Sequence, residues 1–272
     1  MRTASAIGSS LLESYRSLKA DVDARVPRIF DLTPKAEYVV RPVESFREAS
    51  SASAEYLPSA PDGSRPGIFY VNTYDLMARP IWQREALFLH EAVPGDHFQM
   101  SIAQEQEDLP KFRRFDRTTA YLEGWGLYAE TLGDDLELYT DPYQRMGALA
   151  ARIWRANRLV VDTGMHAMGW TRKQAIDWML SNSPQASTDV IAKVERYRAF
   201  SGQALAYMIG QLKFWELRRH ASETLGERFD LRDFHRQVLA EGAMPLIFLE
   251  KNINAWIARR TGAQAGIPQE PR

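Results

Sequence analysis

The sequence contains no cysteine, and this absence narrows the chemistry that the chain can perform. Disulfides, thiolate nucleophiles and cysteine-ligated zinc sites are excluded, so any bound metal must be held by His, Asp or Glu. Histidine is scarce as well, with five residues: His90, His97, His166, His220 and His235. His220 and His235 lie among charged neighbours, so we expect them at the surface and without a metal-binding role.

The chain also lacks an excess of charge of either sign. Lys and Arg number 34 and Asp and Glu 35, which gives a formal net charge of -1. No global field therefore favours nucleic acid or an anionic membrane, and we expect neither as a partner. No apolar run is long enough to span a membrane, and the N-terminal residues lack the apolar core of a signal peptide. We therefore expect a cytoplasmic protein, unless a leader has been removed.

The composition that remains, 45% hydrophobic and 25% charged residues, is typical of a globular domain. After an N-terminal helix, two segments rich in β-branched and aromatic residues predict strands over 36–44 and 67–76. From about residue 80 onward, segments of helical length alternate with breaks at Pro and Gly. We therefore expect a mainly α domain over 1–262 with a small β-sheet near its N-terminal side, and a flexible tail over 263–272.

One short stretch, "LFLHEAVPGDHFQM", concentrates histidines and acids. In the common zinc-hydrolase helix, a second His follows the first by four residues and the Glu between them acts as general base. Here the fourth residue after His90 is Pro94, which ends or kinks the helix. Gly95 then lets the chain turn, so that Asp96 or His97 can approach His90. The alternative is that one helix ends here, Asp96 caps the next, and His90 is a core residue.

A metal site without cysteine commonly takes a further carboxylate from a neighbouring helix. In "TTAYLEGWGLYAETLGDDLEL", Glu123, Glu130 and Glu137 recur every seven residues opposite an apolar stripe, which by itself predicts a solvated acidic face. Gly124 and Gly126 weaken a helix, but they would let a second helix approach closely beside Glu123. Both interpretations stay open on this evidence.

Two further residues are candidates for stabilising an oxyanion. His166 follows Asp162 by four residues, so a carboxylate can orient its imidazole toward a developing negative charge. Otherwise the two form an ordinary helix pair. Tyr207 is a second candidate donor, although an aromatic residue on an apolar helix is more often part of a core. Arg158 precedes Asp162 by four residues and is expected to pair with it.

Five segments resemble, in the same order, the bacterial domain-of-unknown-function family 885: "HEAVPGDHFQ", "AYLEGWGLYAE", "RLVVDTGMHAMGW", "GQALAYMIGQLKFWELR" and "FHRQVLAEGAMPLIFLE". That family is regarded as zincin-like, a helical relative of the gluzincin metallopeptidases. The segment "LEGWGLYAE" also looks like the Asn-Glu-Gly-Phe-Ala segment of gluzincin aminopeptidases, whose Glu binds zinc. The resemblance implies a zincin-like fold and a Zn²⁺-dependent hydrolase of peptide or other small amide bonds. Within it, His90 would be the first ligand, Glu91 the general base and Glu123 the third ligand.

The chain departs from the family form His-Glu-x-x-Pro-Gly-His at one position, where it has Asp96. Asp96 can ligate the metal, or the adjacent His97 can replace the lost donor, or metal binding is weakened or lost. We favour His97, because its neutral nitrogen matches the missing ligand, with Asp96 orienting it. The resemblance further implies that His166 and Tyr207 steady the oxyanion.

Typical members of the family carry a long helical half before the matched region. If that half walls the cleft, this chain has a more open site, or a partner or a second copy covers it. Two alternatives to a peptidase therefore remain: a helical binding or scaffold protein without catalysis, and a metallohydrolase of a non-peptide amide. By the same resemblance, "GIFYVNT" is expected to be an edge strand that pairs with an extended peptide, with Asn72 as a side-chain contact.

Overall fold

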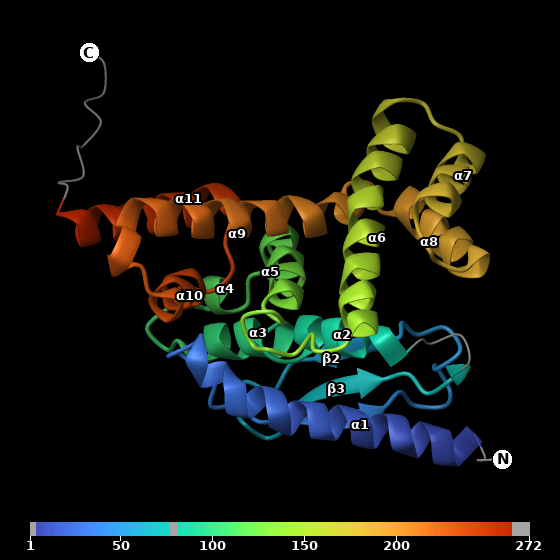
Figure 1. Cartoon of the computed structure of the whole chain (residues 1–272), viewed down its shortest axis with the longest axis horizontal. Helices are drawn as coiled ribbons and strands as arrows, with labels where there is room; N and C mark the ends of the chain where they lie inside the picture. The colour runs from blue at the N-terminus through green and yellow to red at the C-terminus, as the bar shows by residue number, and fades with distance from the viewer. Residues whose placement is uncertain (1–3, 77–80, 263–272) are drawn as a thin grey trace.

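The computed structural model of the chain describes residues 4–76 and 81–262. Its elements run in the following order (Figure 1): α1 (Ala4–Arg25), η1 (Val26–Arg28), β1 (Tyr38–Pro42), β2 (Ala54–Leu57), β3 (Gly67–Val71), η3 (Ile81–Gln83), α2 (Arg84–Glu91), α3 (Asp96–Glu105), α4 (Lys111–Arg114), α5 (Thr119–Thr131), α6 (Pro142–Ala167), α7 (Arg172–Asn182), α8 (Ser187–Ala199), α9 (Gln203–Leu225), η4 (Gly226–Arg228), α10 (Leu231–Leu239) and α11 (Leu246–Thr261). The expected mainly α fold with a small sheet near the N-terminal side is confirmed. The tail expected over 263–272 lies outside the described residues.

The elements are stacked between two outer layers (Figure 1). α1 runs along one side beneath the sheet, and α9 and α11 run along the opposite side. α2 and α3 lie next to the sheet, while α5 and α6 rise from there toward α9. α7 and α8 form a projection at one end beside α6. Residues of α2, α5, α6 and α9 therefore approach one another in the middle of the molecule.

The sheet has the strand order β1-β3-β2, with β1 parallel and β2 antiparallel to β3. The expectation that "GIFYVNT" forms an edge strand is wrong, because β3 is hydrogen-bonded on both sides and every one of its residues is buried. β2, in a stretch that reads from the sequence as polar and turn-rich, is an edge strand instead. An edge position requires only one apolar face, which explains why its sequence signal is weak.

Asn72 follows β3 and has a structural role. Its side chain is fully buried, and its Nδ2 donates to the carbonyl oxygens of Glu48, Ser51 and Ala52 at 2.7, 3.1 and 3.1 Å. The amide thereby satisfies backbone groups in the loop before β2. The expected contact with a substrate is replaced by this network.

The closest helix crossing is that of α5 and α9. A Cβ added to Gly124 would lie 2.4 Å from Gly210 Cα, and one added to Gly210 would lie 2.0 Å from the carbonyl oxygen of Ala120. Only two glycines facing each other permit this approach. The expectation that Gly124 lets a second helix come close beside Glu123 is confirmed.

His235 lies in the core, contrary to the surface position expected from its charged neighbours. Its ring is fully buried, with Nε2 2.9 Å from the Tyr128 hydroxyl and Nδ1 2.8 Å from the Ile29 carbonyl oxygen. Burial lowers the pKa of His235 to about 3. The charged neighbours lie on the other face of the amphipathic helix α10, a distinction that periodicity makes and local composition does not. His220, by contrast, is exposed as expected.

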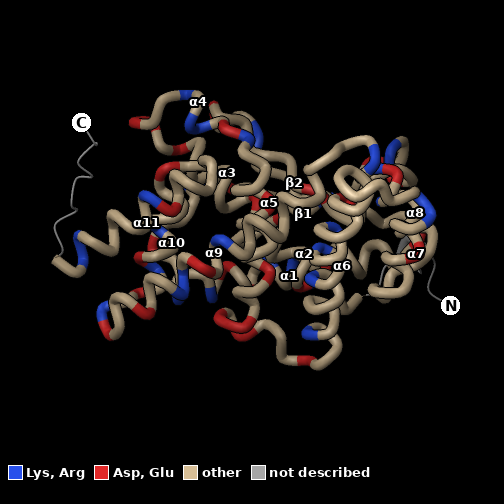
Figure 2. The backbone as a smooth tube through the Cα atoms, turned by 90° about the horizontal axis from the view of Figure 1, so that it is seen from above, with Lys and Arg blue, Asp and Glu red and all other residues tan. Residues whose placement is uncertain are grey.

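No helix among the described residues is both long and apolar enough to cross a membrane. Basic and acidic residues both occur along most of the helices rather than separating onto different parts of the chain (Figure 2).

Candidate metal centre

The Pro-Gly break forms a short turn between α2 and α3. α2 ends at Glu91 and α3 begins at Asp96. A Cβ on Gly95 would lie 1.8 Å from the carbonyl oxygen of His90, so only glycine fits where the chain folds back on the end of α2. The indole of Trp125 holds the turn by donating to the Pro94 carbonyl oxygen at 2.8 Å. The break therefore brings the start of α3 against the end of the helix that carries His90.

The ring of His90 is fixed between two carboxylates of α5. Its Nδ1 lies 2.9 Å from Glu130 Oε1, and its Nε2 lies 3.5 Å from Glu123 Oε2. A Cβ on Gly126 would come within 2.9 Å of the ring, so this glycine makes room for the imidazole. Glu130 is itself only 4% exposed and forms an ion pair with Arg155 at 3.1 Å. One ring nitrogen is thus held by a buried acid, and the other is presented to Glu123.

The space between His90 and Glu123 favours positive charge. Burial lowers the pKa of His90, but the hydrogen bonds to Glu123 and Glu130 outweigh it and raise that pKa well above its ordinary value. Burial raises the pKa of Glu123, but its hydrogen bond to His90 outweighs this and lowers the pKa. Glu123 and Glu130 therefore stabilise a positive charge on the ring of His90. A metal ion bound to the ring nitrogen that faces Glu123 would be stabilised in the same way.

Two further acids, Glu91 and Asp96, lie beside this pair. Burial raises the pKa of Glu91 to about 8, and the charges of Asp96 and Glu123 add to the increase while His90 opposes it. Burial likewise raises the pKa of Asp96 to about 7, with Glu123 adding to the increase. Asp96 Oδ1 accepts from Gln99 Nε2 at 2.9 Å. The side chain of Glu91 forms no hydrogen bond or ion pair with a residue in the described parts of the chain, so no such bond has to break before it acts on a ligand.

Tyr207 reaches the cluster from α9. Its hydroxyl donates to Glu123 Oε1 at 2.8 Å, and its ring lies nearly parallel to that of His90, 6.3 Å away at 21°. Tyr207 precedes Gly210 by about one helical turn, so the close crossing at Gly124 and Gly210 places the hydroxyl beside Glu123. The structure therefore brings together five of the predicted residues: His90, Glu91, Asp96, Glu123 and Tyr207.

The ring of His97 faces the sheet rather than His90. Its Nδ1 lies 2.7 Å from the Tyr56 hydroxyl and 3.3 Å from Ser101 Oγ, and the ring centroid is 4.4 Å from that of Tyr38. Burial, with the nearby charge of Lys19, lowers the pKa of His97 to about 3. Successive residues of a helix point about 100° apart, so Asp96 and His97 cannot face the same ring at the start of α3.

The structure does not bring His166 to the cluster. His166 is exposed near the end of α6, where its Nε2 lies 3.0 Å from the Tyr197 carbonyl oxygen. It follows Arg155, which pairs with Glu130 beside His90, by eleven positions, or roughly 16 Å along the helix. The expected pairs with Asp162 do not form either, because that carboxylate accepts from the backbone nitrogen of Gly202 at 3.1 Å.

Glu130 and Arg155 belong to the cluster although no motif of the sequence predicts a role for them. Glu130 was included in a predicted solvated face, yet it is one of the most buried acids of the described chain. A signal was present, since a ligating histidine commonly gives its second nitrogen to a carboxylate and Glu130 lies on the same face as Glu123. Whether the carboxylate of Glu130 faces water or a buried histidine depends on which helix packs against that face of α5.

The described side chains do not form a complete metal site as they stand. Across residues 4–76 and 81–262, no three His, Asp or Glu side chains gather closely enough to hold a metal ion. The donor types nevertheless suit zinc, because an imidazole nitrogen of His90 lies 3.5 Å from a carboxylate oxygen of Glu123 and zinc accepts both kinds of atom. His90 and Glu123 are two donors, and Asp96 is the nearest further acid on α3.

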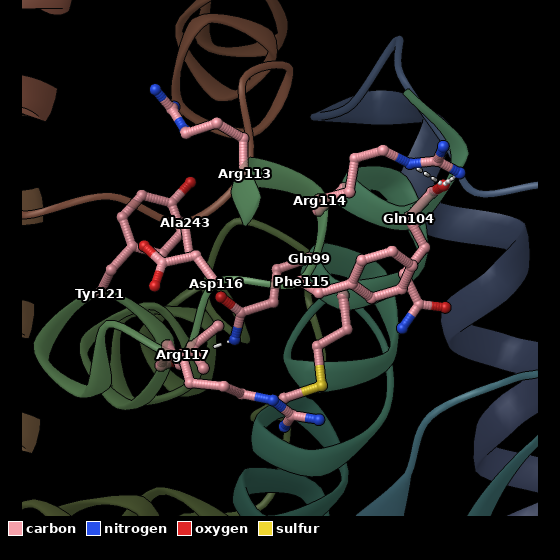
Figure 3. Close-up of a pocket in the computed structure, with 12 residues that line it drawn as sticks. Gln99, Gln104, Arg113, Arg114, Phe115, Asp116, Arg117, Tyr121 and Ala243 are labelled. Atoms are coloured by element: carbon pink, nitrogen blue, oxygen red, sulfur yellow. Dashed lines mark hydrogen bonds between the residues drawn. The ribbon is translucent and has the colours of Figure 1, made fainter. Parts of the chain in front are cut away.

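A pocket between α3, α4 and α5 adjoins the cluster through Gln99 (Figure 3). Gln99 lines this pocket and also binds Asp96, while its own Oε1 is buried without a hydrogen-bond partner. Arg113 and Arg114 at the rim are held by the carbonyl oxygens of Glu241 and Gln104. These interactions hold α4 against α3 and against the segment that follows α10.

The chain belongs to the family described as bacterial protein of unknown function (DUF885), whose model matches residues 1–253. A search of curated proteins gives no match. A crystal structure from Colwellia psychrerythraea is 40% identical, with a TM-score of 0.90 over 92% of this chain. A structure from Shewanella oneidensis is 22% identical over 89% of this chain, with a TM-score of 0.75, and shows the fold alone.

The chain spans less than half the length of these two structures, 43% and 45% respectively. Each of these proteins is described as a "putative lipoprotein", the second of them of unknown function. The family and the fold of this chain are therefore established, whereas its activity and its cytoplasmic location stay predictions.

Proposed function

We propose that the chain carries the catalytic centre of a metal-dependent hydrolase that cleaves a peptide or another amide bond. The observation that supports this most strongly is the setting of His90, with Nδ1 held by buried Glu130 and Nε2 3.5 Å from Glu123. Zinc-ligating histidines commonly give their second nitrogen to a carboxylate. Two ligands of a tetrahedral zinc ion lie roughly 3.3–3.6 Å apart, which is the spacing of this pair.

His90, Glu123 and Asp96 would hold the metal. Asp96 is favoured over His97 because the charge of Asp96 raises the pKa of His90 and of Glu91, which places it near both. The ring of His97 is bonded to Tyr56 on the side of the sheet. Zinc accepts carboxylate oxygen as well as imidazole nitrogen, so an Asp in place of the family's His conserves a ligand.

The remaining residues of the cluster supply proton transfer and oxyanion binding. When bound, zinc would polarise the scissile carbonyl and lower the pKa of a water molecule. Glu91, in its ionised form, would accept a proton from that water and pass it to the leaving amine. Tyr207 would donate its hydroxyl, now bound to Glu123, to the developing oxyanion.

Metal analysis of the purified protein tests this proposal. Protein prepared with zinc should hold about one ion per chain, and His90→Ala and Glu123→Gln should lose it. The exposed His220 and Glu223 offer matched controls, because His220→Ala and Glu223→Gln make the same chemical changes away from the cluster. Glu91→Gln should keep the metal and abolish hydrolysis of a mixed peptide library. Full activity of Glu91→Gln would contradict the assignment of the base.

A pair of substitutions separates Asp96 from His97. We expect Asp96→Asn to lower zinc occupancy and His97→Gln to leave it unchanged. The opposite pattern would make His97 the ligand and would require α3 to rotate from the described position.

A second candidate is a binding protein of the same fold that holds no metal. It is supported by the lack of three converging donors in the described chain and by the charge of His90, which two carboxylates stabilise without any ion. Absence of bound zinc, after preparation with an excess of the metal, would favour this candidate.

A further inference from the structure

Arg158 is a buried cation without a direct ion pair, although its charge helps to lower the pKa of Glu123. It is 9% exposed, forms no ion pair within 4.0 Å with a carboxylate of the described residues, and its Nε has no hydrogen-bond partner. Asp162, one turn further along α6, is occupied by the backbone nitrogen of Gly202. Burying an unpaired charge costs several kcal/mol, so a guanidinium in this state is typical of a site that receives an anion.

The guanidinium is positioned next to the proposed catalytic centre. Its Cζ lies 4.5 Å from the ring centroid of Tyr207 and 5.5 Å from that of Tyr197. The hydroxyl of Tyr207 binds Glu123, so one aromatic ring separates Arg158 from a proposed metal ligand. The two rings also restrict the guanidinium, which reduces the entropy lost when it binds a ligand.

Lys193 adds a second positive charge from α8. Burial lowers its pKa, and the charges of Arg158, Arg196 and Arg155 lower it further, while the charge of Asp189 opposes them. Lys193 precedes Tyr197 by four residues, so the two side chains share a helix face toward Arg158. Lys193 forms no ion pair with a carboxylate of the described residues. Two cations that form no direct ion pair therefore lie where α6, α8 and α9 adjoin the cluster.

We propose that Arg158, supported by Lys193, binds the free C-terminal carboxylate of a peptide substrate. A planar guanidinium matches a carboxylate through two parallel hydrogen bonds. The α-carboxylate of the residue after a scissile bond lies about one residue length from that bond, or ~3.8 Å. A carboxylate so close to the scissile bond can reach Arg158, because only the ring of Tyr207 lies between Arg158 and Glu123. The inference rests on the proposed hydrolase function and specifies its substrate class: peptides from which residues are released at the C-terminal end.

Binding and hydrolysis are measured separately, so that the two proposals can fail separately. The probe is a library of randomised N-acetyl tripeptides, prepared once as free acids and once as C-terminal amides. Retention is measured by equilibrium dialysis with the Glu91→Gln protein, which leaves the peptides intact, and cleavage by mass spectrometry with the wild type. We expect the acids to bind on the order of 10- to 100-fold more tightly than the amides, the range for a hydrogen bond to a charged group.

Substitution of the two cations identifies the site. Arg158→Gln and Lys193→Gln should each reduce the preference for the acids, and Arg158→Gln should nearly abolish it. Arg152→Gln, an exposed arginine on the same helix, is the matched control and should keep the preference. If Arg158→Gln does not fold, as judged by circular dichroism, Lys193→Gln gives the result, because Lys193 is only half-buried.

Equal retention of acids and amides, including no retention of either, would overturn the inference. A preference that persists in folded Arg158→Gln, or in Lys193→Gln where that variant decides, would overturn it as well. A preference for acids without any cleavage would instead contradict the proposed hydrolase and leave the anion site supported.

Discussion

The crossing of α5 and α9 makes Gly210 a sharp test of how the centre is assembled. In Gly210→Ala, the new methyl would lie 2.0 Å from the Ala120 carbonyl oxygen and 2.5 Å from Gly124 Cα. Both are backbone atoms, so no side-chain rotation can relieve the contact, and the helices must separate by about 1 Å to reach ordinary contact. The variant therefore measures packing against local helix preference.

The two effects have opposite signs. Alanine favours a helix over glycine by about 1 kcal/mol, whereas overpacking of a core costs roughly 1–3 kcal/mol or more. Because both contacts are to backbone atoms, the cost belongs at the upper end of that range, so we expect a net loss of about 2 kcal/mol, which would lower Tm by ~4–8 °C in a protein of this size. Separation of the helices should also withdraw the Tyr207 hydroxyl from Glu123. The variant should therefore lose hydrolytic activity even at temperatures well below its Tm, where it is folded.

Thermal unfolding followed by circular dichroism supplies the measurement. Gly8→Ala in α1 is the control, since its Cβ would meet only Thr73 at an ordinary 3.6 Å. That variant should be stabilised by roughly 0.5–1 kcal/mol, the intrinsic helix preference. A Gly210→Ala protein as stable as the wild type, or more stable, would refute the conclusion that close backbone contact determines this crossing.

Three further predictions concern the buried polar groups. Glu130→Gln should weaken zinc binding about 10- to 100-fold, measured by chelator competition, because it removes the carboxylate that orients His90. The pKa of His235 is lowered to about 3 in the folded chain from about 6.5 unfolded, so its stability contribution is complete above pH ~6.5 and is lost as the pH falls toward 3. Urea unfolding of His235→Gln should therefore show a dependence on pH in this range that is weaker by about 1.4 kcal/mol per pH unit. Asn72→Ala should cost about 1–3 kcal/mol in urea unfolding, because three carbonyl groups lose their donor.

Each of these predictions has an outcome that contradicts it. Unchanged zinc affinity in Glu130→Gln would mean that His90 is oriented by packing alone. A wild-type pH dependence in His235→Gln would show that other groups titrate on acid unfolding. Wild-type stability of Asn72→Ala would mean that water replaces the buried amide.

Much of the architecture was predictable from local patterns. Apolar periodicity and Pro–Gly breaks predicted the helices after residue 80, and residue type predicted β1 and β3. The edge strand β2 was missed because its alternation spans only four residues. The surface position predicted for His235 was also wrong, because local composition does not show which face of a helix packs inward.

The candidate metal centre was predictable only in part. His90, Glu91, Asp96, Glu123 and Tyr207 come from segments with recognisable motifs, and the structure brings them together. His97 and His166 come from the same motifs, but they lie against Tyr56 and Tyr197. A motif identifies a segment, whereas the direction of each side chain depends on how its helix is rotated in the packed structure.

By itself, the sequence determined the helical class, the break after Glu91 and the exclusion of cysteine chemistry, because these follow from local backbone preferences and residue types. Only the tertiary structure decided that Glu130 orients His90, that the ring of His97 bonds to Tyr56 on the side of the sheet, and that Arg158 forms no direct ion pair. These contacts join residues that lie far apart in the chain or on different faces of one helix. Their free energies depend on burial, which no local pattern of residues specifies.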